Sequence, residues 1–325
     1  MRYIGYVFIL LAALVTGLLL LGPREPVDGP RLFDEAALTE DLDTYLAARE
    51  GRFDDIVPGV EKRIVWAGEP GAQTTLAIVY IHGFSATSQE IRPVPDEVAE
   101  ALGANLYYTR LAGHGRGAAG MEDGSVPAWR DDYAEAIAIG RRLGERVIVM
   151  GVSTGGTVAA LGLFDREVAQ EEIAGAVMIS PNFKVANPAA GLLTLPFARA
   201  WVPMVAGEER SFEAANEDHA RYWTTTYSTR ALLPMAASVQ AAGALPFGET
   251  RVPALFLFSD DDTVVDHSVT REVAEAWGGP VTIENPELGE GDDPNAHVIA
   301  GDILSPGQTD WAVDTIVAWI ATLGR

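Results

Sequence analysis

A serine flanked by glycines two residues away on each side is the clearest chemical signal in the chain. Ser153 lies in the pattern G-x-S-x-G at residues 151–155, after the apolar run V-I-V-M and before a stretch of small residues. A sharp strand-to-helix turn requires such glycines, because the serine backbone is strained and its neighbours must be small. The turn exposes the hydroxyl and directs a helix N-terminus at it. We therefore predict that Ser153 is a nucleophile.

A serine hydroxyl needs a histidine base. After a G-x-S-x-G turn, the acid and then the histidine are expected later in the chain than the serine. His219, His267 and His297 follow Ser153. His219 stands in a polar stretch typical of solvated surface, and His267 opens a predicted helix, where an exposed position is expected. His297 falls in a loop between the last predicted strand and the last helix, and such a loop can reach the carboxyl edge of a sheet. We predict that His297 is the base.

The acid that orients this histidine is expected just after the predicted strand Ala254–Phe258. Asp260, Asp261, Asp262 and Asp266 all follow that strand closely. Adjacent carboxylates repel one another, so one is expected to turn inward while the others remain in water. The residues alone leave the choice open.

The oxyanion of an acyl-transfer reaction requires backbone N–H donors. One is predicted from Thr154 at the start of the helix. The other is predicted from Phe84, in the sequence H-G-F-S at residues 82–85, where the glycine permits close approach of the backbone. His82 is expected to hold this loop by side-chain hydrogen bonds, and His114, between two glycines, is expected to belong to a structural turn.

The sequence also supplies the elements of a sheet that is buried on both faces, whose loops would position these residues. Short apolar runs predict strands, and longer periodic stretches between them predict helices, an alternation typical of a mostly parallel central sheet flanked by helices. The predicted strands are 60–67, 75–81, 105–110, 147–151, 175–180, 254–258 and 281–284, and the predicted helices are 90–102, 129–143, 154–164, 269–277 and 311–323.

Residues 184–250 interrupt this rhythm with no clear strand and many large apolar side chains. An apolar helical insertion between two core strands is typical of a cap over a ligand site. The core would then comprise 58–183 and 251–325. Trp201, Trp223 and Tyr227 are candidates for contact with the substrate.

The first 22 residues are predicted to meet a membrane. Residues 4–21 carry no charge and would form a helix about 27 Å long, close to the ~30 Å of a bilayer core. The run is longer than most cleaved signal peptides and lacks a small-residue cleavage site. An anchor with its N-terminus in the cytoplasm would place the catalytic body in the periplasm or outside, and a secreted protein released by cleavage is the alternative. Residues 23–57 are predicted to be a linker and a short helix near 38–46.

Composition excludes several functions. The formal net charge of −23 would repel nucleic acid and disfavours electrostatic binding to anionic lipid. The chain has no cysteine, so disulfides, cysteine nucleophiles and cysteine-based metal sites are excluded. The sequence leaves the oligomeric state open.

Together these motifs resemble the α/β-hydrolase superfamily, and within it the bacterial carboxylesterase and monoacylglycerol lipase group. The resemblance covers about residues 75–323 and rests on I-H-G-F-S at 81–85, L-A-G-H-G at 111–115, G-V-S-T-G-G at 151–156, D-T-V-V at 262–265 and H-V-I at 297–299. It implies an α/β-hydrolase fold with a cap, Asp262 as the orienting acid, and Phe84 and Thr154 as oxyanion donors. Two features depart from the group: Thr154 stands where Met, Leu or Gln is common, and the loop at 289–294 is longer and more acidic.

The expected function is hydrolysis of neutral carboxylic esters with short to medium acyl chains, including monoacylglycerols, with no metal or cofactor. Thioester hydrolysis, amide hydrolysis and acyl transfer on the same triad remain alternatives. A catalytically silent, membrane-tethered binding module is an alternative from another class.

Overall fold

The computed structural model describes residues 3, 6, 13, 16–18, 20–168 and 173–324. Within them the core is one sheet of seven strands, in the order β1-β3-β2-β4-β5-β8-β9. The strands are β1 Arg63–Val65, β2 Thr74–Ile81, β3 Asn105–Tyr108, β4 Gly144–Val152, β5 Ile173–Ile179, β8 Ala254–Leu257 and β9 Val281–Glu284.

The sheet is parallel except at one edge, where β1 runs antiparallel to β3. Its central strands bury both faces: along β4, Val147 and Val149 enter one core cluster, whereas Ile148 and Met150 enter the other. The unbroken apolar runs in the sequence follow from this double burial. The mostly parallel α/β fold expected from the sequence is confirmed.

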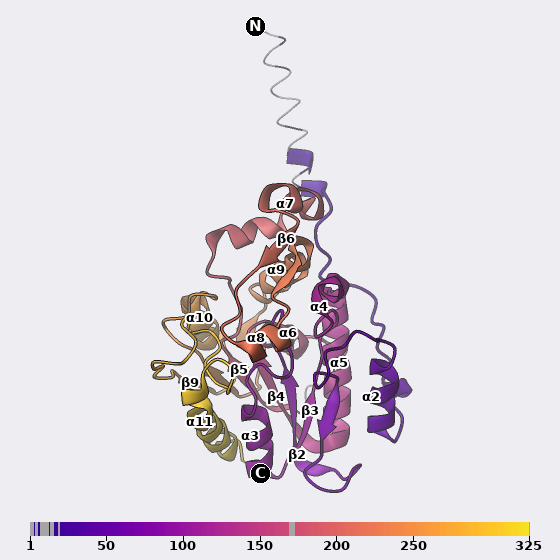
Figure 1. Cartoon of the computed structure of the whole chain (residues 1–325), viewed down its shortest axis with the longest axis vertical. Coiled ribbons are helices and arrows are strands. Elements are labelled where there is room, and N and C mark those ends of the chain that lie inside the picture. The colour runs from indigo at the N-terminus through magenta and orange to yellow at the C-terminus, as the bar shows by residue number, and fades with distance from the viewer. Residues whose placement is uncertain are drawn as a thin grey trace.

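Helices cover both faces of the sheet (Figure 1). One face carries α3 Val94–Leu102 and α11 Thr309–Thr322, and the opposite face carries α5 Val126–Leu143, α6 Thr154–Leu163 and α10 His267–Ala276. The short helix α2 Leu42–Glu50 packs against α5 through a buried ionic cluster, in which Arg49 of α2 and Lys62, just before β1, both contact Glu135 of α5. The helix predicted near 38–46 thus begins and ends about one helical turn later in the chain than predicted.

Several predicted boundaries differ from the structure by a few residues, and two of the differences have clear local reasons. The first strand is only three residues long, because it is an edge strand that pairs with β3 alone. Helix α3 starts at Val94 rather than residue 90, because proline at 93 and 95 is tolerated only in the first turn of a helix.

The insertion between β5 and β8 lies above the strands in Figure 1, and we call it the cap. It includes a short two-stranded sheet, β6 with β7, which the sequence analysis did not predict. Its elements are η3 Pro188–Thr194, α7 Ala198–Ala206, β6 Glu209–Ser211, α8 Glu217–Tyr222, β7 Thr226–Ser228, η4 Thr229–Ala231, α9 Leu232–Ala242 and η5 Phe247–Glu249. The remaining short elements are η1 Glu35–Ala37, α4 Gly117–Gly120, η2 Met121–Asp123 and η6 Pro306–Gln308.

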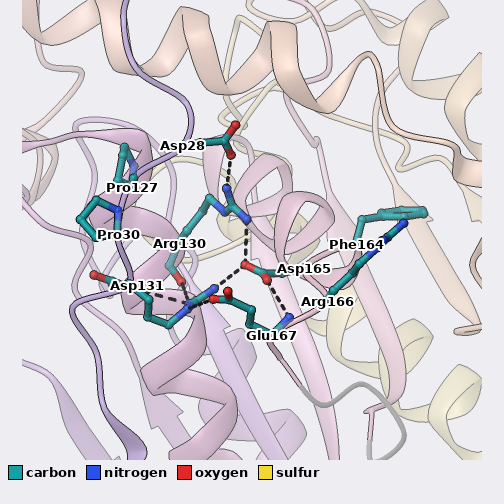
Figure 2. Close-up of a pocket in the computed structure, with 11 residues that line it drawn as sticks. Asp28, Pro30, Pro127, Arg130, Asp131, Phe164, Asp165, Arg166 and Glu167 are labelled. Atoms are coloured by element: carbon teal, nitrogen blue, oxygen red, sulfur yellow. Dashed lines mark hydrogen bonds and ion pairs between the residues drawn. The ribbon is translucent and has the colours of Figure 1, made fainter.

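The predicted membrane segment, residues 4–21, falls largely outside the described residues. Across the part of the chain that the structure does describe, no helix combines the length and apolarity needed to cross a bilayer. The linker that follows is ordered against the cap and the body. Figure 2 shows its attachment to the body, where Asp28 pairs with Arg130 at 2.6 Å. Arg31 of the linker also pairs with Asp165, at 2.5 Å.

Candidate active site

Ser153 occupies a tight turn between the end of β4 and the start of α6. Its backbone has φ 50° and ψ −117°, a strained conformation for a residue with a side chain. The turn is held by three backbone hydrogen bonds: the Ser153 N–H donates to the Ile179 carbonyl at 2.9 Å, and the Ser153 carbonyl accepts from Thr157 at 3.1 Å and Asn182 at 3.1 Å. The glycines are required, because a Cβ at Gly151 would lie 2.7 Å from backbone atoms of the helix.

The structure brings Ser153, His297 and Asp262 into one hydrogen-bonded row. His297 Nε2 lies 3.0 Å from the Ser153 hydroxyl oxygen, and His297 Nδ1 lies 2.8 Å from Asp262 Oδ2. All three residues are buried. With Nδ1–H donating to the carboxylate, Nε2 is free to accept the serine proton, as a general base requires.

The position of the carboxylates distinguishes among the candidate acids. Asp262 alone of the four contacts the imidazole, and its second oxygen accepts the N–H groups of Val264 at 2.8 Å and Val265 at 2.9 Å. Asp260 instead pairs with Arg271 at 2.6 Å on the surface. Asp266 caps α10. Asp262 is thus held in a fixed orientation by its own loop.

The electrostatic surroundings of His297 favour its protonation. Burial by itself would lower the pKa of His297, but the charge and hydrogen bond of Asp262, with smaller contributions from Glu90 and Asp293, raise it above the ordinary value. The same interactions would stabilise the imidazolium that forms when the serine proton is taken up.

Asp293 positions the backbone that carries His297, a role the sequence analysis missed. Its carboxylate accepts the N–H of His297 at 3.1 Å and of Val298 at 2.9 Å, and its own N–H donates to Ser305 Oγ at 3.0 Å. The acidic loop noted in the sequence therefore holds the histidine in place. An aspartate four residues before the histidine, in a loop rich in Gly and Pro, was the available signal.

The loop that carries Phe84 packs directly on the start of α6. A Cβ at Gly155 would lie 2.1 Å from the Ile81 carbonyl oxygen, so the two segments touch through backbone. Phe84 and Thr154 both line the cavity that contains Ser153. Neither N–H donates a hydrogen bond to another group within the described part of the chain. The Thr154 hydroxyl is likewise buried without a partner among those residues.

His82 and His114 hold the surrounding loops. The Leu111 N–H donates to His82 Nε2 at 3.1 Å, which leaves Nδ1–H facing the Gly83 carbonyl at 2.8 Å. Burial lowers the pKa of His82 well below its usual value, and it lowers that of His114 to about 4. Both are therefore neutral at pH 7, and His82 fixes its loop by side-chain hydrogen bonds as expected.

Glu90 is a second residue that sequence analysis missed. Its carboxylate is buried beside the cavity and accepts the Gly83 N–H at 2.6 Å and the Tyr80 hydroxyl at 3.4 Å. Burial raises the pKa of Glu90 to about 7, against the lowering effects of the Gly83 hydrogen bond and the charge of His297. The sequence offered no signal for it, because an isolated glutamate at the start of a predicted helix is ordinarily exposed.

Replacing Glu90 by Gln preserves an acceptor for the Gly83 N–H but removes a charge that raises the pKa of His297. The pKa of His297 should then fall, so that the imidazole stays neutral at lower pH. Because the pKa of Glu90 is itself about 7, its carboxylate is only partly ionised on the acid limb. We therefore expect the acid limb of kcat/KM for a soluble ester to move to lower pH by about 0.3 unit. Glu213→Gln, which removes an exposed cavity carboxylate, is the control. An unshifted limb in Glu90→Gln would contradict the coupling.

A cavity of about 560 Å³ lies between Ser153 and the cap, within the range of small-molecule sites (~300–1,000 Å³). Of the three aromatic residues proposed from the cap, Trp223 and Tyr227 line it. Trp201 does not, because its indole N–H donates to the Pro196 carbonyl at 3.1 Å and its ring packs within α7 and its neighbours.

His219 was expected on solvated surface, but it lines this cavity and its ring contacts Trp223 with centroids 4.7 Å apart. The cap helix α8 turns it inward, and partial burial lowers its pKa. Among the described residues, no group of three or more His, Asp or Glu side chains is arranged to hold a metal ion.

A mostly parallel sheet with a serine turn after its central strand, and a histidine and an aspartate delivered by later loops, is the arrangement of α/β-hydrolases. The chain belongs to this class: the model of the Alpha/beta hydrolase family matches residues 78–300. A search of curated proteins finds no significant match.

Solved structures share the fold at low sequence identity. A structure of the metagenome-derived lipolytic enzymes LipS and LipT aligns with TM-score 0.65 and 19% identity over 82% of this chain and 99% of that chain. The monoacylglycerol lipase of Paleococcus ferrophilus aligns with TM-score 0.55 and 17% identity over 81% and 100%. A soluble variant of monoglyceride lipase from Saccharomyces cerevisiae aligns with TM-score 0.59 and 11% identity over 82% and 91%.

Proposed function

We propose that this chain is a serine hydrolase of neutral carboxylic esters with short to medium acyl chains, including monoacylglycerols. The observation that carries the proposal is the buried row in which Ser153, His297 and Asp262 are joined by hydrogen bonds of 3.0 and 2.8 Å. The cap cavity above the row offers aromatic and aliphatic surface for an acyl chain. Resemblance to lipolytic enzymes in fold adds support.

In the proposed reaction, the Ser153 oxygen attacks the ester carbonyl carbon while His297 Nε2 takes the hydroxyl proton. The N–H groups of Phe84 and Thr154 donate to the tetrahedral oxyanion. His297 then gives the proton to the leaving alcohol, and the C–O bond of the ester breaks to leave an acyl-serine. Water, deprotonated by the same histidine, attacks this acyl-enzyme and releases the acid, and the proton returns to Ser153.

Labelling with a fluorophosphonate probe tests the proposal. We expect stoichiometric labelling of the wild type at Ser153, located by peptide mass spectrometry, because the probe reacts with an activated serine. Turnover of matched ester, thioester and amide substrates separates ester hydrolysis from the other acyl reactions, and we expect the ester to react fastest. A folded protein that takes up no label would contradict the serine hydrolase and favour the binding module.

We also propose that the uncharged run at residues 4–21 holds the protein in a membrane, with the body in the periplasm or outside the cell. The proposal rests on the length of the run and on Arg2, which precedes it. Release of the body after cleavage of this segment is the alternative. Mass spectrometry of the N-terminus in the membrane fraction distinguishes them.

A further inference from the structure

The exposed apolar side chains of the described residues gather at two places that adjoin each other. Of the fourteen large exposed apolar residues, ten lie either between 3 and 21 or between 192 and 205. The second group belongs to η3, α7 and the segment between them, and we call it the cap apex: Leu192, Leu195, Phe197, Met204 and Val205. Met204 is 84% exposed and Val205 is 78% exposed. Isolated exposed apolar residues are ordinary, but a contiguous group marks a contact surface.

The end of the N-terminal run is fastened directly to the cap apex. The Phe197 N–H donates to the Pro23 carbonyl at 2.7 Å, and the Arg199 guanidinium pairs with both oxygens of Glu25 at 2.8 and 2.6 Å. Gly22 packs so closely that a Cβ there would lie 2.5 Å from the Phe197 ring. The uncharged run therefore ends beside the apex, and Figure 1 shows the helical residues that immediately precede Gly22 next to α7.

The linker is also fastened to the body, as Figure 2 shows. Arg31 pairs with Asp165 at 2.5 Å and with Glu167 at 3.1 Å, and the Leu32 N–H donates to Asp131 at 2.9 Å. A linker held at two places cannot act as a free tether. The orientation of the cap relative to the end of the run is thus set by the fold.

We propose that the cap apex lies in the interface of a lipid bilayer, the same bilayer that residues 4–21 enter. This inference rests on the proposed membrane attachment but not on the triad. The run of eighteen uncharged residues ends at residue 21, directly before Gly22, and the Phe197 N–H holds the next residue, Pro23. A bilayer that this run enters would therefore reach the cap apex. Because the chain carries a net charge of −23, apolar insertion and not attraction to anionic headgroups would supply the contact.

The position of η3 connects this surface to the site. Ala189, Ala190 and Leu193 line the cavity, whereas Leu192 on the same short helix is 52% exposed at the apex. One element therefore separates the apex from the acyl cavity. The substrate class that this arrangement favours is a single-chain amphiphilic ester that resides in the bilayer.

The absence of cysteine permits a site-specific test with the full-length chain. Met204→Cys carries an environment-sensitive fluorophore, and the protein is reconstituted in phosphatidylcholine vesicles with or without a lipid that bears a nitroxide on its acyl chain. The matched control is Glu69→Cys, because Glu69 is exposed in the loop before β2, at the end of the strands opposite the cap. We expect a blue shift and several-fold quenching for the label at 204, and neither for the label at 69. Failure to co-float with vesicles, or co-flotation with an unquenched label at 204, overturns the proposal.

A kinetic arm keeps this proposal separate from the proposed function. The double variant Met204→Ser and Val205→Ser should hydrolyse a monoacylglycerol in vesicles about tenfold more slowly than wild type, because apolar burial at the interface is lost. Its rate on soluble nitrophenyl acetate should stay within about twofold of wild type. If the double variant matched wild type on both substrates, the bilayer contact would be overturned while ester hydrolysis would remain intact. If the wild-type protein hydrolysed neither substrate, the proposed function would be overturned, whereas the fluorescence test of the bilayer contact would still be valid.

Discussion

Ser153→Ala should lower kcat for a nitrophenyl ester by about five to six orders of magnitude, and it should abolish fluorophosphonate labelling. Alanine retains the Cβ and removes only the oxygen that lies 3.0 Å from His297 Nε2. The strained turn has the same backbone requirement for either residue, so the fold should remain. The residual rate would come from the cavity and the backbone donors, which the substitution leaves in place.

The matched control for this variant is Ser238→Ala. Ser238 is also buried, but it lies on α9, where its hydroxyl donates to the Met235 carbonyl at 2.7 Å, and it does not line the cavity. We expect its activity to remain near that of wild type. Thermal unfolding of both variants checks the fold. A folded Ser153→Ala protein with wild-type turnover would end the hydrolase proposal.

Asp262→Asn should lower kcat by about four orders of magnitude. Asp262 Oδ1 accepts two backbone N–H groups, from Val264 and Val265. An asparagine would keep its carbonyl oxygen toward these donors and turn its NH₂ group to the imidazole. His297 Nδ1 would then have to accept, Nε2 would carry the proton, and the base would face Ser153 in the wrong tautomer.

The pH profile gives this variant a second readout. The Asp262 carboxylate raises the pKa of His297, against the lowering effect of burial, so the acid limb of the residual activity should move to lower pH. Asp261→Asn is the control, because Asp261 is exposed and does not contact the imidazole. An Asp261→Asn protein that loses as much activity as Asp262→Asn would refute the assignment of the acid.

Only the fold could show how Glu90 and Asp293 contribute to the site. Both bind backbone N–H groups of loops that carry other site residues: Glu90 that of Gly83, and Asp293 that of His297. A carboxylate is informative in sequence when it sits in a motif, and neither does. Their effect depends on burial and on which loop faces them, which are properties of packing.

Local steric and hydrophobic requirements are what the sequence determined by itself. The turn at Ser153 requires glycines within two residues, and strands buried on both faces require unbroken apolar runs. The serine turn and the strands could therefore be predicted from local sequence patterns. The order of elements then placed His297 after the last strand. The choice of Asp262 came from family resemblance, because four neighbouring aspartates satisfy the same local rules.

The tertiary structure decided what depends on contacts between distant segments. It turned Asp262 and not its neighbours toward the imidazole, directed His219 into the cavity, and left Trp201 packed beside Pro196. It also fastened the linker to the cap apex through Pro23 and Glu25. These outcomes depend on which surfaces come into contact when the cap, the loops and the linker pack together. The spacing of residues along the chain does not determine those contacts.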